Sequence, residues 1–242
     1  MKIEDIHPLG IESDTFTSTQ VFLSSKIDLN NVWTVKDIKY CAGVDLAYWV
    51  EGEIEWGVCS IVVIDYETKN VVEKTYSVGQ ITVPYIPGYL AFRELPLVLE
   101  AAQKISNVPD LFIFDGNGYL HPRHIGIATH AAFFLNKPTI GVAKSYFKID
   151  NADFEMPENQ ASSYKEIKVQ NEVYGRVLRT HKDVKPIFIS CGNEIDLETT
   201  TEVILNLIDK ESRLPIPVRL ADLESRLLRR HLSKANSLSG SK

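Results

Sequence analysis

The hydrophobic periodicity of this chain changes near residue 90, and the change limits the folds available to it. Before that point, β-forming residues alternate or run together in YCAGVDLAYW, GVCSIVVID and VVEKTYSVG, with a turn-like YETKN between the last two. Segments of this kind predict strands paired as an antiparallel meander. After it, PGYLAFRELPLVLEAAQKI has apolar residues at helical spacing, and Pro96 inside this helix predicts a kink or a fresh helix start. The helical apolar positions are Ala91, Leu95, Val98, Ala102 and Ile105.

Strands and helices then alternate to the end of the chain. DLFIFDG, PTIGVAKS, EVYGRVLRT and KPIFISCG indicate strands, and HIGIATHAAFFL, LETTTEVILNLIDKES and VRLADLESRLLRRHL indicate helices. TQVFLSSKI indicates a short amphipathic helix near the start. The alternation implies parallel pairing with helices on the faces. We therefore expect one α/β domain over residues 1–235, a mixed β-sheet flanked by helices that resembles the ribonuclease H-like nucleases, and a disordered tail over residues 236–242.

Composition narrows the class of protein further. The chain has no apolar run of membrane-spanning length and no secretory signal in its first residues, so we expect a cytoplasmic protein without a membrane partner. Cys41, Cys59 and Cys191 form no CxxC pair, which favours buried free thiols. The net charge of −6 counts mildly against binding nucleic acid by charge alone. It does not exclude a nuclease whose carboxylates hold metal ions.

Two aspartates lie in apolar surroundings. Asp45 shares a strand face with Gly43 and Ala47, whose small side chains leave room around the carboxylate. A buried charge needs a partner or a metal, and a hydrogen bond to backbone is an equal alternative. Asp115 ends the strand LFIFD before a glycine-rich loop, where ligand sites of parallel sheets gather. The alternative for Asp115 is a turn closed by its own side chain.

Three further charged residues have weaker signals. Glu94 flanks the apolar stripe of its helix and can reach inward, but the residues alone favour a solvated side chain. Asp222 lies between Arg219 and Arg226 at helical pair spacing, which favours a surface ion pair. Lys144 alternates with apolar residues of a strand, so its amine should meet an anion.

The type of these residues points to metal chemistry that uses oxygen ligands. His121, His124 and His130 match no standard zinc spacing, which favours supporting, phosphate-binding or structural roles. Mg²⁺ prefers oxygen ligands, and two or three carboxylates at one sheet edge meet that need. A metal there can stabilise the oxygens of a phosphodiester, and a nearby lysine can stabilise charge on the phosphate. The set therefore suggests metal-dependent phosphoryl transfer.

Three longer segments are similar to a known family. VPYIPGYLAFRELP and DGNGYLHPRHIGIATHAAFFLNKPTIGVAKS resemble the two signature blocks of endonuclease V, and CAGVDLAY resembles its first metal-binding strand. The resemblance covers the chain from about Tyr40 to about Leu228. It implies a ribonuclease H-like endonuclease that uses Mg²⁺ or Mn²⁺, recognises inosine in nucleic acid and acts in DNA repair. It also implies cleavage of the second phosphodiester 3′ to the lesion, leaving 3′-hydroxyl and 5′-phosphate ends.

The resemblance assigns roles to the charged residues. Asp45, Glu94 and Asp115 would carry the metal. Asp222 falls where members of the family carry either His or Asp, and it is a further candidate ligand. Lys144 matches the family's lysine near the scissile phosphate.

The resemblance also implies a substrate surface. His121 matches the active-site histidine, and Tyr85 matches the wedge that fills the gap left by a displaced base. An aromatic ring suits this task because it stacks on the neighbouring bases. The alternative for the Tyr85 segment is an ordinary rigid turn. The other implied substrate-binding positions are Ile86, Pro87, Gly88, Gly116, Gly118 and Arg123.

Two other functions remain open at this point. One is a ribonuclease H-like nuclease acting on branched or flap DNA, or on inosine-containing RNA. The other is a catalytically silent nucleic-acid-binding protein, against which the intact set of Asp45, Glu94, Asp115 and Lys144 argues. We expect nucleic acid to be the partner and the chain to act as a monomer. The sequence leaves the choice between DNA and RNA open.

Overall fold

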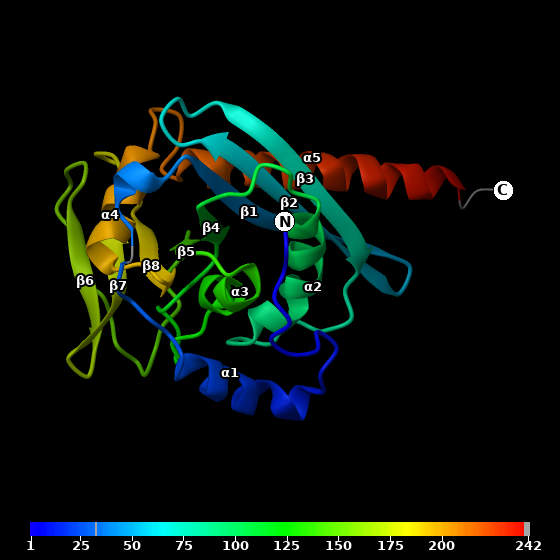
Figure 1. The fold of residues 1–242 in the computed structure, drawn as a ribbon, viewed down its shortest axis with the longest axis horizontal. Helices are drawn as coiled ribbons and strands as arrows, with labels where there is room; N and C mark the ends of the chain where they lie inside the picture. The colour runs from blue at the N-terminus through cyan, green and yellow to red at the C-terminus, as the bar shows by residue number, and fades with distance from the viewer. Residues whose placement is uncertain (32, 240–242) are drawn as a thin grey trace.

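A single mixed sheet of eight strands organises the molecule, with helices on both of its faces (Figure 1). The computed structural model describes residues 1–31 and 33–239. In chain order the strands are β1 (Tyr40–Glu51), β2 (Ile54–Asp65), β3 (Val71–Gln80), β4 (Leu111–Asp115), β5 (Thr139–Ala143), β6 (Tyr164–Val169), β7 (Glu172–Leu178) and β8 (Ile187–Asn193). The α-helices are α1 (Phe16–Ser24), α2 (Leu90–Gln103), α3 (Ile127–Leu135), α4 (Leu197–Asn206) and α5 (Ile216–Ser239). Two 3₁₀ turns, η1 (Ser13–Thr15) and η2 (Val35–Asp37), precede the sheet.

The strand order explains the two hydrophobic periods of the sequence. The sheet runs β3-β2-β1-β4-β5-β8-β7-β6. β1, β2 and β3 pair antiparallel as the predicted meander, whereas β4 pairs parallel with both β1 and β5. The last three strands are antiparallel to their neighbours. The predicted ribonuclease H-like fold, a mixed sheet flanked by helices, is therefore confirmed.

Side chains of β1 and β4 alternate between two apolar cores, because successive residues of a strand point to opposite faces. Even-numbered residues such as Val44 and Phe114 pack with α2 and α3 on one face. Odd-numbered residues such as Cys41 and Ile113 pack with α4 and α5 on the other face. The parity of a residue on these two strands therefore decides which helices it meets.

Several elements differ from the sequence-based expectations. α2 runs without interruption through Pro96, which excludes a fresh helix start there. Strand β6 was not predicted, although Ile167 and Val169 alternate with exposed residues along it. α5 continues to Ser239, into the segment expected to be disordered, and residues 240–242 lie outside the described part of the chain.

Two other expectations concern cysteines and membranes. All three cysteines are free and buried, as predicted. Burial raises the pKa of the Cys41 and Cys191 thiols to about 12. None of the helices in the described residues has the length and apolar character needed to cross a membrane.

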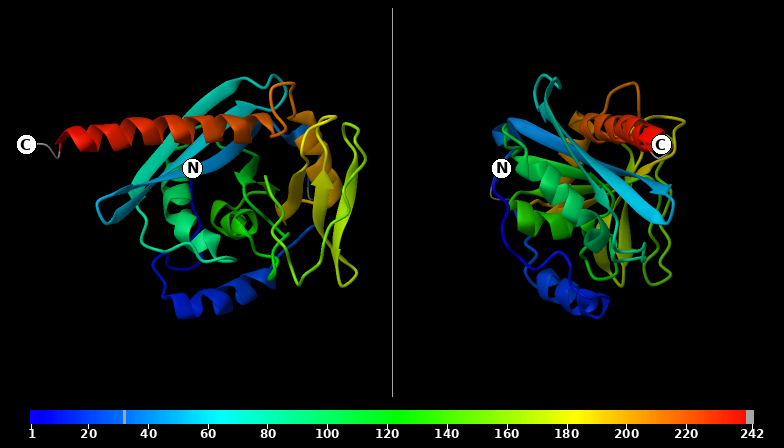
Figure 2. Two further views of the ribbon diagram at one scale, coloured as in Figure 1. Left: turned by 180° about the vertical axis from the view of Figure 1, so that it is seen from behind. Right: turned by 90° about the vertical axis from the view of Figure 1, so that its right-hand side faces the viewer.

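α5 lies directly on β1, and the contact depends on a glycine. A Cβ added at Gly43 would lie 2.1 Å from the carbonyl carbon of Pro217, at the start of α5. Because both the strand and the helix backbone are held at this point, a side chain cannot be accommodated without moving α5. Beyond the contact, α5 continues past the edge of the sheet (Figure 2).

We predict that Gly43→Ala destabilises the protein by about 1–3 kcal/mol, the usual cost of overpacking a filled core. The free energy of unfolding from urea titrations measures this directly. Gly10→Ala is the matched control, since a Cβ at Gly10 would have nothing within 4 Å. Equal stability of the two variants would show that α5 does not need this close approach.

Candidate active site

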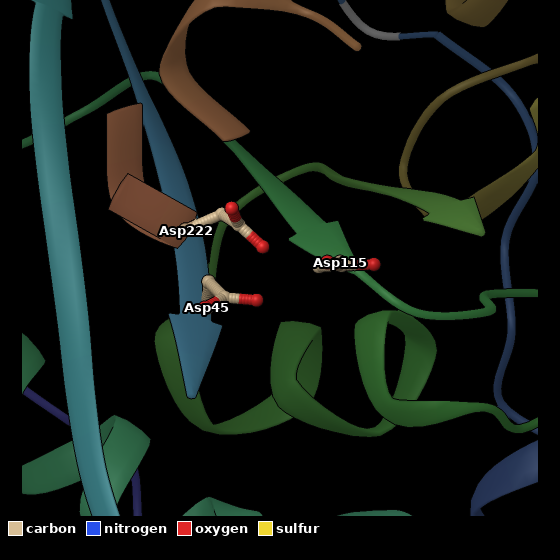
Figure 3. A group of neighbouring side chains, drawn as sticks. All are labelled: Asp45, Asp115 and Asp222. Carbon is tan, nitrogen blue, oxygen red and sulfur yellow. The ribbon is translucent and has the colours of Figure 1, made fainter. Parts of the chain in front are cut away.

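Three aspartates from distant parts of the chain converge on the face of the sheet covered by α5 (Figure 3). Asp45 lies within β1 and Asp115 at the end of β4, one residue beyond the paired residues Val44 and Phe114. Both positions are odd-numbered, so both side chains face α5. Asp222 comes from the second turn of that helix. One oxygen from each of the three carboxylates lies within 4.8 Å of the others.

Asp45 is held in an environment that opposes its charge. Asp45 is only 8% exposed, and its Oδ2 accepts a hydrogen bond from the Ser225 hydroxyl at 2.5 Å. Desolvation raises the pKa of Asp45 to about 7, and the neighbouring Asp115 and Asp222 add to the shift. The hydrogen bond from Ser225 opposes it. Without a cation, Asp45 therefore gains a proton more easily than an ordinary aspartate.

Lys144, just beyond β5, binds two of the three aspartates. Its Nζ lies 2.5 Å from Asp115 Oδ2 and 2.9 Å from Asp222 Oδ1. Burial alone would lower the pKa of this ammonium, but the two carboxylates raise it overall. The expectation that Lys144 meets an anion is confirmed.

Asp222 has a further partner one helical turn away. The guanidinium of Arg226 lies 2.8 Å from its Oδ1, as the pair spacing predicted, whereas Arg219 pairs instead with Asp209 and Glu211. The interpretation of Asp222 as a surface ion pair is therefore incomplete, because its carboxylate also faces the group of three.

Glu94 lies apart from this group, on α2 and hence on the other face of the sheet. It is buried, so the interpretation of a solvated glutamate is wrong. Its carboxylate accepts a hydrogen bond from the Tyr48 hydroxyl. Desolvation raises the pKa of Glu94 to about 8, and the charges of Asp45 and Asp115 contribute to that shift. Glu94 is thus coupled to the group electrostatically, although the described structure does not include it among the converging ligand atoms.

A small cavity lies at the start of α2, between the loop before this helix and the loop after Asp115. Leu90 and Ala91, which line it, lie on α2 one turn before Glu94, and Asn117, which also lines it, lies two residues after Asp115. The complete lining is Tyr85, Gly88, Leu90, Ala91, Asn117, His121, Ile125, Gly126, Ile127 and Phe147. Tyr85 is 64% exposed, so its ring stands at the surface of the protein.

The ring of His121, which lines the cavity, has a defined protonation state and two hydrogen-bond partners. Burial lowers the pKa of His121 to about 4, so the ring is neutral at pH 7. Its Nδ1 accepts a hydrogen bond from the backbone N–H of Arg123 at 3.1 Å. The proton must then be on Nε2, which donates to the Gly88 carbonyl at 2.9 Å. His121 therefore fixes the loop that precedes α2, where Ile86, Pro87 and Gly88 lie.

The other predicted substrate positions differ in their surroundings. Arg123 donates to the same Gly88 carbonyl and to the Gln20 side chain. Gly116 has a positive φ of 154°, and a Cβ there would lie 2.7 Å from the Ile127 side chain. Gly118 packs against the backbone of Cys191, away from the cavity lining. Of the three glycines predicted to bind substrate, Gly88 lines the cavity, whereas Gly116 and Gly118 do not.

The other two histidines of the predicted cluster, His124 and His130, contact protein side chains. His130 is fully buried, and its Nε2 lies 2.7 Å from His7 Nε2. His124 lies beside Glu172 at 3.4 Å. Within the described residues, the three aspartates are the group whose geometry could hold a metal.

Ser225, Asn117 and Phe147 are among the residues of this region that the sequence-based predictions missed. Ser225 follows Asp222 by three positions, and this helical spacing was a usable signal. Asn117 lies in the loop after Asp115, where a polar side chain next to two glycines also offered a signal. Phe147 had none, because it lies in an irregular segment after β5.

The donor set fits a hard divalent cation. All three converging ligands are carboxylates, and Mg²⁺ prefers such oxygen atoms. Burial raises the pKa of Asp45 toward neutrality, the charges of Asp115 and Asp222 add to the shift, and a cation would relieve the repulsion among the carboxylates. The chemistry and the electrostatics of the site therefore both favour an ion of this class.

Comparison with known proteins agrees with this geometry. Residues 22–223 match the family model described as Endonuclease V. An Endonuclease V from Bacillus thuringiensis subsp. konkukian is 62% identical over 217 residues, covering 90% of this chain and 92% of that protein. The crystal structure of the Bacillus subtilis Endonuclease V has a TM-score of 0.94 and 53% sequence identity, covering 97% of this chain and 100% of that chain.

A more distant relative was crystallised with a nucleic acid. Ciona intestinalis Endonuclease V, in complex with a 24mer DNA containing an inosine followed by a ribo-adenosine, has a TM-score of 0.79 and 27% identity. That match covers 90% of this chain and 98% of the Ciona chain. From the family model and the extent of these similarities, the chain belongs to the endonuclease V family and is a nuclease.

Proposed function

We propose that this protein is a metal-dependent endonuclease that recognises inosine in nucleic acid and cleaves the second phosphodiester 3′ to it, leaving 3′-hydroxyl and 5′-phosphate ends. One observation carries the proposal: three carboxylates converge, and the loop that follows one of them, Asp115, lines a small cavity together with the exposed Tyr85. The Ciona relative bound to inosine-containing DNA supports the choice of lesion.

Asp45, Asp115 and Asp222 are the residues that would hold Mg²⁺, or Mn²⁺ in its place. When bound, the ion would supply positive charge to stabilise the oxygens of the scissile phosphodiester. Glu94 adds negative potential from the opposite face of the sheet, consistent with its coupling to Asp45 and Asp115. Ser225 orients the Asp45 carboxylate through its hydrogen bond.

Lys144 supplies a positive charge. In the protein alone, its ammonium neutralises part of the charge of Asp115 and Asp222. From this position the ammonium would stabilise negative charge on a phosphate oxygen of a strand bound at the aspartates. His121 acts as a positioning residue, because its ring is neutral and already holds the Gly88 carbonyl.

The cavity and Tyr85 provide the recognition of the base. A base displaced from the strand would enter the cavity between the α2 loop and the loop after Asp115. The Tyr85 ring, exposed at the surface, would stack where the base had been. Polar groups at the cavity, including the Asn117 side chain, offer hydrogen bonds to the Watson–Crick edge of the base.

The direct test uses matched DNA and RNA oligonucleotides, with and without one inosine, incubated with the protein and Mg²⁺. Mapping the ends locates the cut and identifies the terminal groups. Cleavage of undamaged strands at an equal rate would contradict the proposal, as would tight binding of inosine without any cleavage. The DNA and RNA arms also determine which nucleic acid is preferred.

We predict that Asp45→Ala and Asp115→Ala each reduce the nicking rate by more than roughly 100-fold in Mg²⁺. Even residues that only support a metal ligand change activity by about 10–100-fold, and a ligand should count for more. Rates are measured under single turnover at saturating protein. Asp14→Ala, a change of an exposed aspartate, is the control. Near wild-type rates for both site variants would refute the assignment.

The metal-free protein should lose stability as the pH rises from about 5 to 8. The folded-state pKa values of Asp45 and Glu94, about 7 and about 8, lie above their ordinary values of 3.8 and 4.5. Between these values the folded protein binds more protons than the unfolded chain, so raising the pH favours unfolding. Thermal melts in EDTA across this range test the sign.

Excess Mg²⁺ should raise the melting temperature most at pH 8, because it binds the folded state and relieves the repulsion. Asp45→Asn removes one charge at nearly constant size, so this variant should show a smaller gain. A wild-type melt that is indifferent to Mg²⁺, with a destabilised Asn variant, would mean that Asp45 is held by protein hydrogen bonds alone.

Tyr85→Ala should weaken binding to inosine-containing strands more than to undamaged ones. Loss of one base–aromatic stack costs ~1–3 kcal/mol. Because the ring is exposed, the variant should keep the stability of the wild type, and a thermal melt checks this. Fluorescence anisotropy with the two oligonucleotides measures the difference. Equal weakening of both would make Tyr85 a structural residue of its loop.

A further inference from the structure

The C-terminal half of α5 is strongly basic in an otherwise acidic chain. Residues 226–234 include Arg226, Arg229, Arg230 and Lys234 and no acidic residue. The whole chain has 26 Lys and Arg against 32 Asp and Glu. This segment also follows residue 223, where the match to the family model ends. This segment is therefore a local concentration of positive charge directly after the helix turn that carries Asp222.

The basic residues continue the helix face that carries the site. Arg226, Arg229 and Arg230 follow Asp222 by four, seven and eight positions, which places them on the same side of the helix. Arg229 also follows Ser225 by four positions. We call Arg226, Arg229 and Arg230 the basic face of α5. It begins one turn from Asp222 and leads away from the aspartates along the helix axis.

Two arginines of the basic face have no ion-pair partner among the described residues, so their charge is not neutralised within the protein. Arg226 is bound to Asp222, but within residues 1–31 and 33–239 neither Arg229 nor Arg230 forms an ion pair. Arg230 is exposed and Arg229 is half-buried. In Figures 1 and 2, the C-terminal end of α5 extends beyond the sheet.

We propose that the basic face of α5 binds the phosphate backbone of the nucleic-acid strand whose scissile bond lies at the aspartates. Guanidinium groups bind phosphate oxygens through two parallel hydrogen bonds. At a rise of about 1.5 Å per residue, Arg229 and Arg230 lie about 10–12 Å along the helix from Asp222. With a phosphate about every 3.4 Å of axis on each strand, this distance spans roughly three phosphates.

This inference rests on the proposed function, since it takes the strand at the aspartates as its starting point. It also accounts for the acidic composition. The net charge of −6 repels nucleic acid. Positive side chains grouped next to the site can still attract phosphates there. The basic face of α5 provides such a local concentration, and it contacts backbone without reading bases.

The test measures equilibrium binding of Arg229→Gln/Arg230→Gln in EDTA, by fluorescence anisotropy with a labelled inosine-containing oligonucleotide at several salt concentrations. Losing two phosphate contacts should reduce the slope of log affinity against log salt by about 1.4–1.8. From 50 to 200 mM salt, the wild type should then lose roughly tenfold more affinity than the variant. Undamaged oligonucleotide should show the same change, because the contacts are to backbone.

Lys36→Gln/Lys39→Gln is the matched control. It removes two exposed positive charges in the segment just before β1, outside α5, and it should leave the salt slope unchanged. Glutamine keeps the helical propensity of the α5 variant high. Melting temperatures of both variants confirm that they are folded.

The outcomes separate this inference from the proposed function. If the wild type binds oligonucleotide with the expected salt slope but never nicks inosine strands, the proposed function fails and the binding surface stands. If the α5 variant keeps the wild-type affinity and slope, the inference is overturned, whatever the nicking rate. The α5 variant is also compared with the wild type for binding to vesicles of anionic lipid. If the variant loses vesicle binding but keeps oligonucleotide binding, the basic face of α5 binds a membrane, and the inference is overturned.

Discussion

The contact between α5 and β1 at Gly43 determines where the third aspartate lies. β1 and β4 place Asp45 and Asp115 next to each other through parallel pairing, and both face the same side of the sheet. Asp222 reaches them only because the helix backbone lies against the strand with no side chain between. A helix held farther out by one methyl group would carry Asp222 away from the other two carboxylates.

Once the carboxylates are together, the protein must compensate for their charge. Lys144 binds two of them, Ser225 donates to the third, and Arg226 pairs with Asp222 from the solvent side. These partners do not cancel all that opposes the charge, since burial, together with the neighbouring carboxylates, still raises the pKa of Asp45. Such a site is stable enough to fold and still gains from a cation. The same helix that closes the site also carries the charges that we assign to the substrate backbone.

The sequence predicted the sheet well because its strands follow a regular period. It also predicted Asp45 and Asp115, since a carboxylate inside or at the end of an apolar strand contrasts with its neighbours. Asp222 and Glu94 were harder, because helical spacing defines which residues share a face but not which face meets the sheet. Only tertiary packing shows that Asp222 faces the aspartates, while Glu94 is buried on the other side. The loop residue Phe147 lies in an irregular segment where no periodicity exists to interpret.

The origin of the three aspartates has a consequence for the order in which the protein is made. Asp45 and Asp115 belong to the first half of the chain, whereas Asp222 and Ser225 come from α5. A ribosome that has completed β4 has therefore made only two of the three carboxylates. The group forms when α5 has been synthesised, has left the exit tunnel and has docked on β1. Assembly of the potential metal site thus waits for the last helix, and a partly made chain lacks it.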